Sequence, residues 1–367
     1  MDNKLWEKLL SKGLRLKSSE ASLLFSRILK SIDKGEDKGF YMLTSFLSAL
    51  SARGPGLNEL YGMCRAILRS RIRRLNLSFK GKAVQVGRSG RGSIKTINVM
   101  TPASIIASAA SGIILKSVFT HWSYPSSLDV LREMGLNPYM DMKKAVKVAK
   151  KLKLLILDSS SIFTWASKLH EMGVRYGEVL EPSSEPLITA MAAAMNPFNA
   201  KMAFRGAPTL DSARVMAKLY RRMGYTRALI AVSHGPKNMT LNCLSNVWDN
   251  TIIEVRGKRI LKVSLSPEDL GLMRAKPSDI KHPQSIDAAA KVILEVLAGI
   301  RRGPLSDFLI LNAASMLYVS GKVKSMKDGL EACRQAVYDG DALRKLMSLV
   351  RASGGDVTRL KGMLKSI

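Results

Sequence analysis

A glycine-rich segment with interleaved basic residues constrains this chain more than any other feature. Residues 86–101 read VGRSGRGSIKTINVMT, after a short apolar run and before a helical pattern of small residues. This order predicts a strand, a loop and a helix. Glycines let successive backbone N–H groups turn toward one point, and a helix start adds partial positive charge, so the loop suits a phosphate. The alternative interpretation is a glycine-rich turn whose arginines only face solvent.

Downstream of this loop, short apolar runs alternate with helical patterns. Such alternation indicates a largely parallel sheet with helices on both faces. The predicted fold class is therefore α/β, with a small all-helical domain and a larger α/β domain around a mostly parallel central sheet. The expected strands are 83–86, 113–118, 154–157, 228–232 and 252–255, and the expected helices are 101–112, 128–134, 142–152, 210–223 and 288–297.

Two segments carry helical periodicity without intervening strands. Apolar residues recur at three- and four-residue spacing through 1–75, and helix-like sequence returns at 161–195. We expect a helical domain built from 1–75 and 161–195, and an α/β domain built from 76–160 and 196–367. The tail, 307–319 and 326–350, is expected to form helices that pack on the sheet.

The charge of the chain is far from balanced. Lysine and arginine total 58 against 29 acidic residues, a formal net charge of +29. No acid occurs from Tyr61 to Leu128, a stretch that includes the glycine loop. A charge this large attracts nucleic acid or anionic membrane at long range, so it favours a polyanionic partner.

The positions of the cysteines and the lengths of the apolar runs indicate the expected cellular location of the protein. Cys64, Cys243 and Cys333 are far apart, with no Cys/His cluster, which argues for a reducing compartment and against structural zinc. No apolar run reaches about 18 residues, so neither a signal peptide nor a membrane span is expected. The expected location is cytoplasmic, with no membrane partner.

Several stretches together resemble a known family. In chain order they read TINVMTPAS, SSLDVLREMGLNP, MNPFNAK, RRMGYTRALIAVSHG, SPEDLGL and LILNAASMLYVSGKVKSMKDGLEACRQAVYDG. Over nearly the whole chain this order resembles anthranilate phosphoribosyltransferase, while RYGEVLEPSSEPLITA is more similar to pyrimidine nucleoside phosphorylases, which share the fold. The resemblance implies a cleft between the two domains and, commonly, a homodimer through the helices.

The glycine loop departs from the pattern of that family. The family loop reads G-T-G-G-D, whose acid and glycines manage the magnesium pyrophosphate of phosphoribosyl pyrophosphate. Here Arg91 or Gly92 stands in place of the acid. The following K-T-x-N is kept as Lys95, Thr96 and Asn98, so an anion can still be held.

Other family positions also differ. Of the K-H-G-N-R-S motif only Lys116 and scattered serines remain, and Lys237 and Asn238 occupy the place of a magnesium-binding Asp-Glu pair. A hard divalent cation loses its preferred oxygen ligands without carboxylates. Met191 and Met195 stand where the phosphorylases hold the base with a serine and a lysine.

These substitutions favour one functional interpretation and leave two alternatives. We interpret the chain as a non-catalytic, pseudoenzyme relative that binds nucleic acid through phosphate contacts, RNA or a ribonucleoprotein ahead of DNA. We assign no catalytic residue, metal or cofactor, and a homodimer through the helical domain is considered possible. The first alternative is an active phosphoribosyltransferase or nucleoside phosphorylase with an altered ribosyl substrate, using Lys95, Thr96, Asn98 and Lys116 for phosphate. The second is a scaffold subunit of an RNA–protein assembly.

The candidate residues fall into two groups. The predicted nucleic-acid surface comprises Arg65, Arg69, Arg71, Arg73, Arg74, Lys80, Lys82, Arg88, Arg91, Lys95 and Lys116. The predicted phosphate loop comprises Gly87, Gly90, Gly92, Thr96 and Asn98.

Overall fold

A computed structural model describes residues 2–70, 82–87, 92–118, 126–180, 183–196 and 198–367. The chain begins with a short helix and a π-helical turn, which precede a group of three longer helices. These elements are α1 (Asp2–Trp6), η1 (Glu7–Ser11), α2 (Ser18–Asp33), α3 (Asp37–Arg53) and α4 (Leu57–Arg69). The apolar residues of α2 recur every three or four positions, so they form one buried face, which packs on α3 and α4.

A buried carboxylate fixes the start of α4. Glu59 accepts hydrogen bonds from Arg53 Nη2 (2.6 Å), Leu16 N (2.9 Å) and Gly56 N (2.8 Å). Burial acts to raise the pKa of Glu59, but these donors outweigh it and hold the pKa below its ordinary value. One side chain therefore ties α4 to the end of α3 and to the loop before α2.

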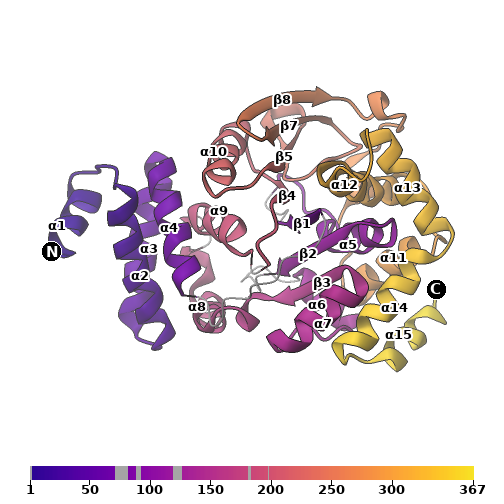
Figure 1. Ribbon diagram of the computed structural model, residues 1–367, viewed down its shortest axis with the longest axis horizontal. Coiled ribbons are helices and arrows are strands. Elements are labelled where there is room, and N and C mark those ends of the chain that lie inside the picture. Colours follow the sequence, from indigo (N-terminus) through magenta and orange to yellow (C-terminus); the bar gives the residue numbers. More distant parts are fainter. Residues whose placement is uncertain (1, 71–81, 88–91, 119–125, 181–182, 197) are drawn as a thin grey trace.

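The chain returns to these helices after the third strand of the sheet. Helices α8 (Thr164–Leu180) and α9 (Glu185–Ala194) pack on α2, α3 and α4, and Figure 1 shows them between the N-terminal helices and the sheet. The Cys64 thiol donates a hydrogen bond to the Ala190 carbonyl oxygen across the contact of α4 with α9.

The sheet has a parallel part and an antiparallel part. Its order is β3-β2-β1-β4-β5-β7-β8, with β6 pairing β5. Pairing is parallel from β3 through β5 and antiparallel from β5 through β7 to β8. The strands are β1 (Ala83–Val86), β2 (Ile113–Val118), β3 (Leu154–Asp158), β4 (Met202–Gly206), β5 (Arg227–His234), β6 (Thr240–Leu241), β7 (Asp249–Arg256) and β8 (Arg259–Leu265).

Helices of the α/β domain cover the sheet. Two buried helices, α5 and α12, pack on each other and on its parallel strands, while α10 packs on β5 and β7 on the side of the helical domain (Figure 1). These helices are α5 (Met100–Ala109), α6 (Ser127–Glu133), α7 (Met142–Leu152), α10 (Leu210–Arg222), α11 (Ile286–Leu297), α12 (Pro304–Ser320), α13 (Met326–Tyr338), α14 (Asp341–Ser353) and α15 (Val357–Leu364). None of the described helices is long and apolar enough to span a bilayer.

The predicted fold class is confirmed: a helical N-terminal domain is joined to a larger α/β domain with a mostly parallel sheet. The expected strand at 252–255 lies in β7, which runs antiparallel to β5. Strands β4, β6 and β8 were not expected from the sequence. The expected helix through residue 75 is described only as far as α4 at Arg69. The domain limits at 75, 160 and 195 stay predictions.

The end of β4 approaches another backbone segment very closely. A Cβ atom on Gly206 would collide with the backbone carbonyl of Asn242, just after β6. Backbone atoms cannot move aside as a flexible side chain can, so the residue here has to lack a side chain.

We therefore predict that Gly206→Ala destabilises the fold by about 3 kcal/mol, at the upper end of overpacking costs. The matched control is Gly362→Ala in α15, where nothing lies within 4 Å of the new methyl group. The control should gain up to about 1 kcal/mol from helix propensity. Urea denaturation measures both free energies, and equal effects of the two substitutions would contradict the close approach.

Candidate functional site

The carboxyl ends of the parallel strands meet at one edge of the sheet, where α/β folds bind their ligands. Gly87 follows β1 there, and Lys116 lies near the end of β2. Asp158, Gly206 and His234 end β3, β4 and β5. This edge is the candidate functional site.

Gly87 continues the pairing of β1 with β4. Its N–H donates to the Phe204 carbonyl oxygen at 2.8 Å. A Cβ atom at this position would lie 2.7 Å from the Cβ of Arg205. The first residue of the glycine loop is thus a glycine because β4 leaves no space for a side chain.

Lys116 brings a buried cation to the same residue. Its side chain is only 4% exposed, and its Nζ donates to the Gly87 carbonyl oxygen at 3.4 Å. A buried ammonium group is costly unless it is hydrogen-bonded or paired with an anion. Lys116 is therefore held at the start of the glycine loop by the Gly87 carbonyl oxygen.

The second arm of the glycine loop is anchored by backbone hydrogen bonds. Ser93 N donates to Thr240 O at 2.7 Å, and Thr240 N donates to Ser93 Oγ at 2.9 Å. Thr96 forms an antiparallel bridge with Lys281. Gly92 packs against β6, where a Cβ atom would lie 2.9 Å from Thr240 O. These contacts hold the chain in place as it approaches α5.

The beginning of α5 carries an unused hydroxyl group. Thr101, in the first turn, is 2% exposed, and its Oγ1 has no hydrogen-bond partner. Val99 precedes the helix, and no side chain caps its first N–H groups. A buried hydroxyl without a partner costs free energy, so this position suits a ligand that accepts hydrogen bonds.

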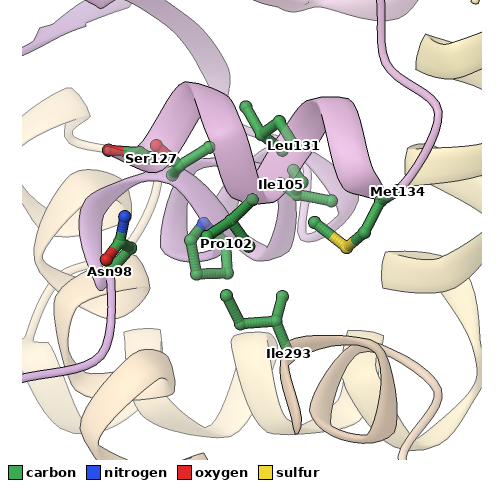
Figure 2. Close-up of a pocket in the computed structure, with 9 residues that line it drawn as sticks. Asn98, Pro102, Ile105, Ser127, Leu131, Met134 and Ile293 are labelled. Carbon is green, nitrogen blue, oxygen red and sulfur yellow. The ribbon is translucent and has the colours of Figure 1, made fainter. Parts of the chain in front are cut away.

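A narrow pocket opens beside this helix start, between α5, α6 and α11. Figure 2 shows Asn98 and Ser127 at one end and Leu131, Met134 and Ile293 around the other. Thr101 also lines this pocket. The polar end lies at the beginning of α5, whereas the remaining wall is apolar.

His282 lies beside the loop arm and was not selected from the sequence. Its backbone N–H donates to Lys95 O, and its Nδ1 lies 2.6 Å from Pro283 O. Because a carbonyl only accepts, Nδ1 carries the proton and Nε2 presents a lone pair, which is buried without a partner. Burial lowers the pKa of His282, the contact with Pro283 opposes this, and the charge of Lys95 lowers it further. The imidazole is therefore neutral near pH 7.

The structure separates the predicted basic residues. Arg65 and Arg69 lie on α4 of the helical domain, and Lys82 precedes β1 at the end opposite Gly87, with its Nζ beside Gly321. Lys95 is exposed on the loop arm, and Thr96 and Asn98 are half-buried near it. Seven candidates lie outside the described residues, namely Arg71, Arg73, Arg74, Lys80, Arg88, Gly90 and Arg91.

The described residues do not fit a magnesium ion. Nowhere in the described part do three His, Cys, Asp or Glu side chains gather as a metal site. Asp158 is buried at the sheet edge, and its Oδ1 accepts a hydrogen bond from Ser160 N. Lys237 and Asn238, at the family's acidic positions, are exposed. A hard cation finds too few oxygen ligands here.

Comparison with known proteins identifies the family. The family described as "Glycosyl transferase family, a/b domain" matches residues 82–343. This chain belongs to that family. Anthranilate phosphoribosyltransferase from Bacillus cereus is 26% identical over 87% of this chain and 89% of its own length. The Methanosarcina mazei protein of that name is 27% identical, over 92% of this chain and 86% of its own. The crystal structure of anthranilate phosphoribosyltransferase from Thermus thermophilus superposes with a TM-score of 0.79 at 24% identity, covering 95% of this chain and 99% of its own.

The nucleic-acid-binding interpretation is therefore wrong. Relatives over most of the chain are named as phosphoribosyltransferases, which are enzymes, so neither a non-catalytic pseudoenzyme nor an RNA- or DNA-binding protein is supported. The physical reason is that the net charge of a chain does not say where in the fold each charged side chain lies. Lys116 is buried in β2, and Lys82 lies at the end of β1 opposite Gly87. The described candidates therefore do not form one basic surface.

We predict that His282 contributes to a loss of stability in acid. The pKa of His282 is lower in the folded state than in the unfolded state. As the pH falls through about 6.5, the unfolded state therefore binds a proton before the folded state does. The stabilising contribution of the neutral imidazole to the folded state, present above that pH, is lost. Between about pH 7.5 and 5.5 the melting temperature should fall less in His282→Gln than in the wild type.

Burial and the charge of Lys262 also lower the pKa of His234. His234 can therefore contribute to the same loss of stability in acid, and a matched variant measures its share. His234→Gln should reduce the same fall independently, and the double variant should combine both effects. Identical pH profiles for His282→Gln and the wild type, measured by calorimetry, would show that His282 is not held neutral by the fold.

Proposed function

We propose that this protein is an active phosphoribosyltransferase with an altered substrate. In that reaction the bond from the anomeric carbon of ribose to a diphosphate oxygen breaks, a bond to the acceptor forms, and the acceptor loses a proton. Support comes from family membership and from relatives of that name over most of the chain. Nucleoside phosphorylase is less favoured, because Met191 and Met195, where those enzymes hold the base with polar residues, are buried apolar side chains.

The observation that carries this proposal is the beginning of α5. The Thr101 hydroxyl is buried without a partner, beside the uncapped first turn and the half-buried Asn98. Backbone N–H groups at a helix start together with a hydroxyl donor match the oxygens of a phosphate. We assign one phosphate of the donor to this position.

Lys116 acts on the leaving group. Negative charge grows on the diphosphate oxygens as the bond to ribose breaks. A buried ammonium group at the start of the glycine loop stabilises this charge more strongly than one in water. Lys95, on the exposed loop arm, adds a second cation that reaches the donor from solvent.

Magnesium, which the resemblance implies, has no step in this mechanism. Two of the positions at which the family places acids hold Lys237 and Asn238, and the described residues gather no ligand set. The charge of the donor has to be balanced by side chains of the chain itself.

We predict that Thr101→Val raises the KM for phosphoribosyl diphosphate about tenfold or more, the effect of losing a hydrogen bond to a charged group. Its melting temperature should stay the same or rise, because the hydroxyl has no partner to lose. Transfer is measured as diphosphate release with anthranilate and other aromatic amines as acceptors.

The control for this prediction is Thr44→Val in α3, whose hydroxyl donates only to the Phe40 carbonyl oxygen in its own helix. Its KM should not change. Absence of diphosphate release from the wild type with every acceptor tested, with or without magnesium, would contradict the proposed activity.

We further propose that the protein forms a homodimer through the helical domain. Large apolar side chains are exposed on its outermost elements, including Leu10 (48%) on η1, Leu23 (37%) on α2 and Tyr41 (67%) on α3. These elements lie at the end of the molecule opposite the C-terminal helices (Figure 1). Burying such side chains against a second copy removes apolar surface from water.

Leu23→Lys combined with Tyr41→Lys should therefore give a monomer, measured by light scattering after size-exclusion chromatography, with an unchanged circular dichroism spectrum. Leu261→Lys on β8 replaces an equally exposed apolar residue and should leave the dimer intact. A stable dimer has a nanomolar Kd. A wild-type protein that is still monomeric at a protein concentration about 100 times that Kd would argue against this interface.

A further inference from the structure

The outer side of helix α7 presents a row of lysines to solvent. The apolar residues of α7 pack on β3 and α14, and Figure 1 shows the helix at the lower edge of the α/β domain. The chain contains no acid from Met142 to Leu157. We use the term lysine face for the exposed lysines of α7 and of the residue that follows it, namely Lys143, Lys147, Lys150, Lys151 and Lys153.

Helical geometry gathers these side chains on one surface. The lysines of α7 recur at intervals of three and four residues, which is the spacing of neighbours on a single helix face. Lys153 follows the helix and directly precedes β3. Lys345 on α14 lies beside it, because its Nζ donates to the Leu152 carbonyl oxygen at 3.0 Å. The basic surface therefore continues from α7 onto α14.

The lysine face has no counter-charge of its own. Within the part of the chain that the structure describes, none of its five members forms an ion pair. Asp141 caps the helix, where its Oδ1 accepts hydrogen bonds from the backbone N–H groups of residues 143 and 144. On the neighbouring helices, by contrast, Arg344 pairs with Asp341 and Arg359 pairs with Glu133. Lysines four residues apart on a helix repel each other, so this face destabilises the isolated protein slightly.

The composition of the lysine face indicates the kind of partner. Every residue of α7 that is fully exposed is a lysine. The cores of protein interfaces are instead depleted of lysine and enriched in aromatic residues, methionine and arginine. An anionic bilayer needs neither an apolar anchor nor a guanidinium group, because its surface potential attracts each nearby lysine through charge alone.

The position of the lysine face suits a flat support. Lys153 lies at the amino end of β3, whereas the candidate functional site lies at the carboxyl ends of the parallel strands. A surface that covers the lysine face therefore leaves the candidate site open to solvent. Because the apolar side of α7 is buried in the domain, the helix cannot insert among the lipid chains.

We propose that the lysine face holds this protein on a membrane surface that contains anionic phospholipid. This inference is independent of the proposed function. The expectation of no membrane partner rested on the absence of a long apolar run, which bears on spanning a bilayer and not on adsorption to its surface.

The test is sedimentation of the full-length protein with vesicles of phosphatidylcholine and phosphatidylglycerol in equal parts. The wild type should bind these vesicles, and it should not bind vesicles of phosphatidylcholine alone. Binding should weaken as salt rises, because the Debye length shrinks from about 10 Å at about 0.1 M to about 3 Å at about 1 M.

The test variant replaces the lysines at positions 143, 147, 150 and 151 with glutamine. Its partition onto the mixed vesicles should fall about a hundredfold or more, since each lysine near an anionic surface contributes about fivefold. It should melt no lower than the wild type, because the repulsion between like charges on α7 is removed. Unchanged vesicle binding in this variant would refute the role of the lysine face.

The matched control removes the same net charge from four separate places. It carries Lys30→Gln on α2, Lys218→Gln on α10, Lys258→Gln between β7 and β8, and Lys324→Gln before α13, all at exposed positions. This variant should keep most of the vesicle binding. Equal losses in the two variants would overturn the proposal, because only the net charge of the chain would then matter.

Two further outcomes decide against a bilayer as the partner. Absence of wild-type binding to the mixed vesicles at low salt overturns the proposal outright. Binding of polyglutamate or RNA that depends on the lysine face, without binding to vesicles, would assign this face to another polyanion and also overturn it.

Discussion

Close packing of backbone segments at the carboxyl ends of β1 and β4 is the constraint on which the site depends. Gly87 lies against Arg205, and Gly206 lies against the backbone after β6. Because neither glycine carries a side chain, two strand ends and a third segment meet with little space between them. Lys116 of β2 and Arg205 of β4 both lie against the first residue of the loop, Gly87.

The strands that the sequence predicted include β2 (IILKSV) and β3 (LLILD), each of which opens on at least three consecutive apolar residues. Strand β4 was missed because its sequence, MAFRG, carries an arginine where a buried strand is expected to be apolar. Strand β8 was missed because it is largely exposed and mixes basic with apolar residues. A buried charged residue that interrupts the apolar run expected of a strand often marks a position at which function overrides stability.

The candidate site was predictable only in part. Motif spacing selected Gly87, Asn98 and Lys116, because these residues keep the family pattern. It could not select Thr101 or His282, whose interest lies in a polar atom buried without a partner, a property of packing and not of residue type. Net charge misdirected the functional interpretation, because a sum over the chain treats the buried Lys116 like any surface lysine.

The return of the chain to the helical domain at α8 and α9 affects how this domain folds during synthesis on the ribosome. Helix α4 packs on α9, and the Cys64 thiol bonds to Ala190, so this domain is completed only after more than a hundred further residues have emerged. During that interval the part of α4 that packs on α9 has no covering helix, although α2 already packs on α4. Chains of this size expose apolar surface while they fold, and this face would be the natural place for a chaperone to act on the nascent protein.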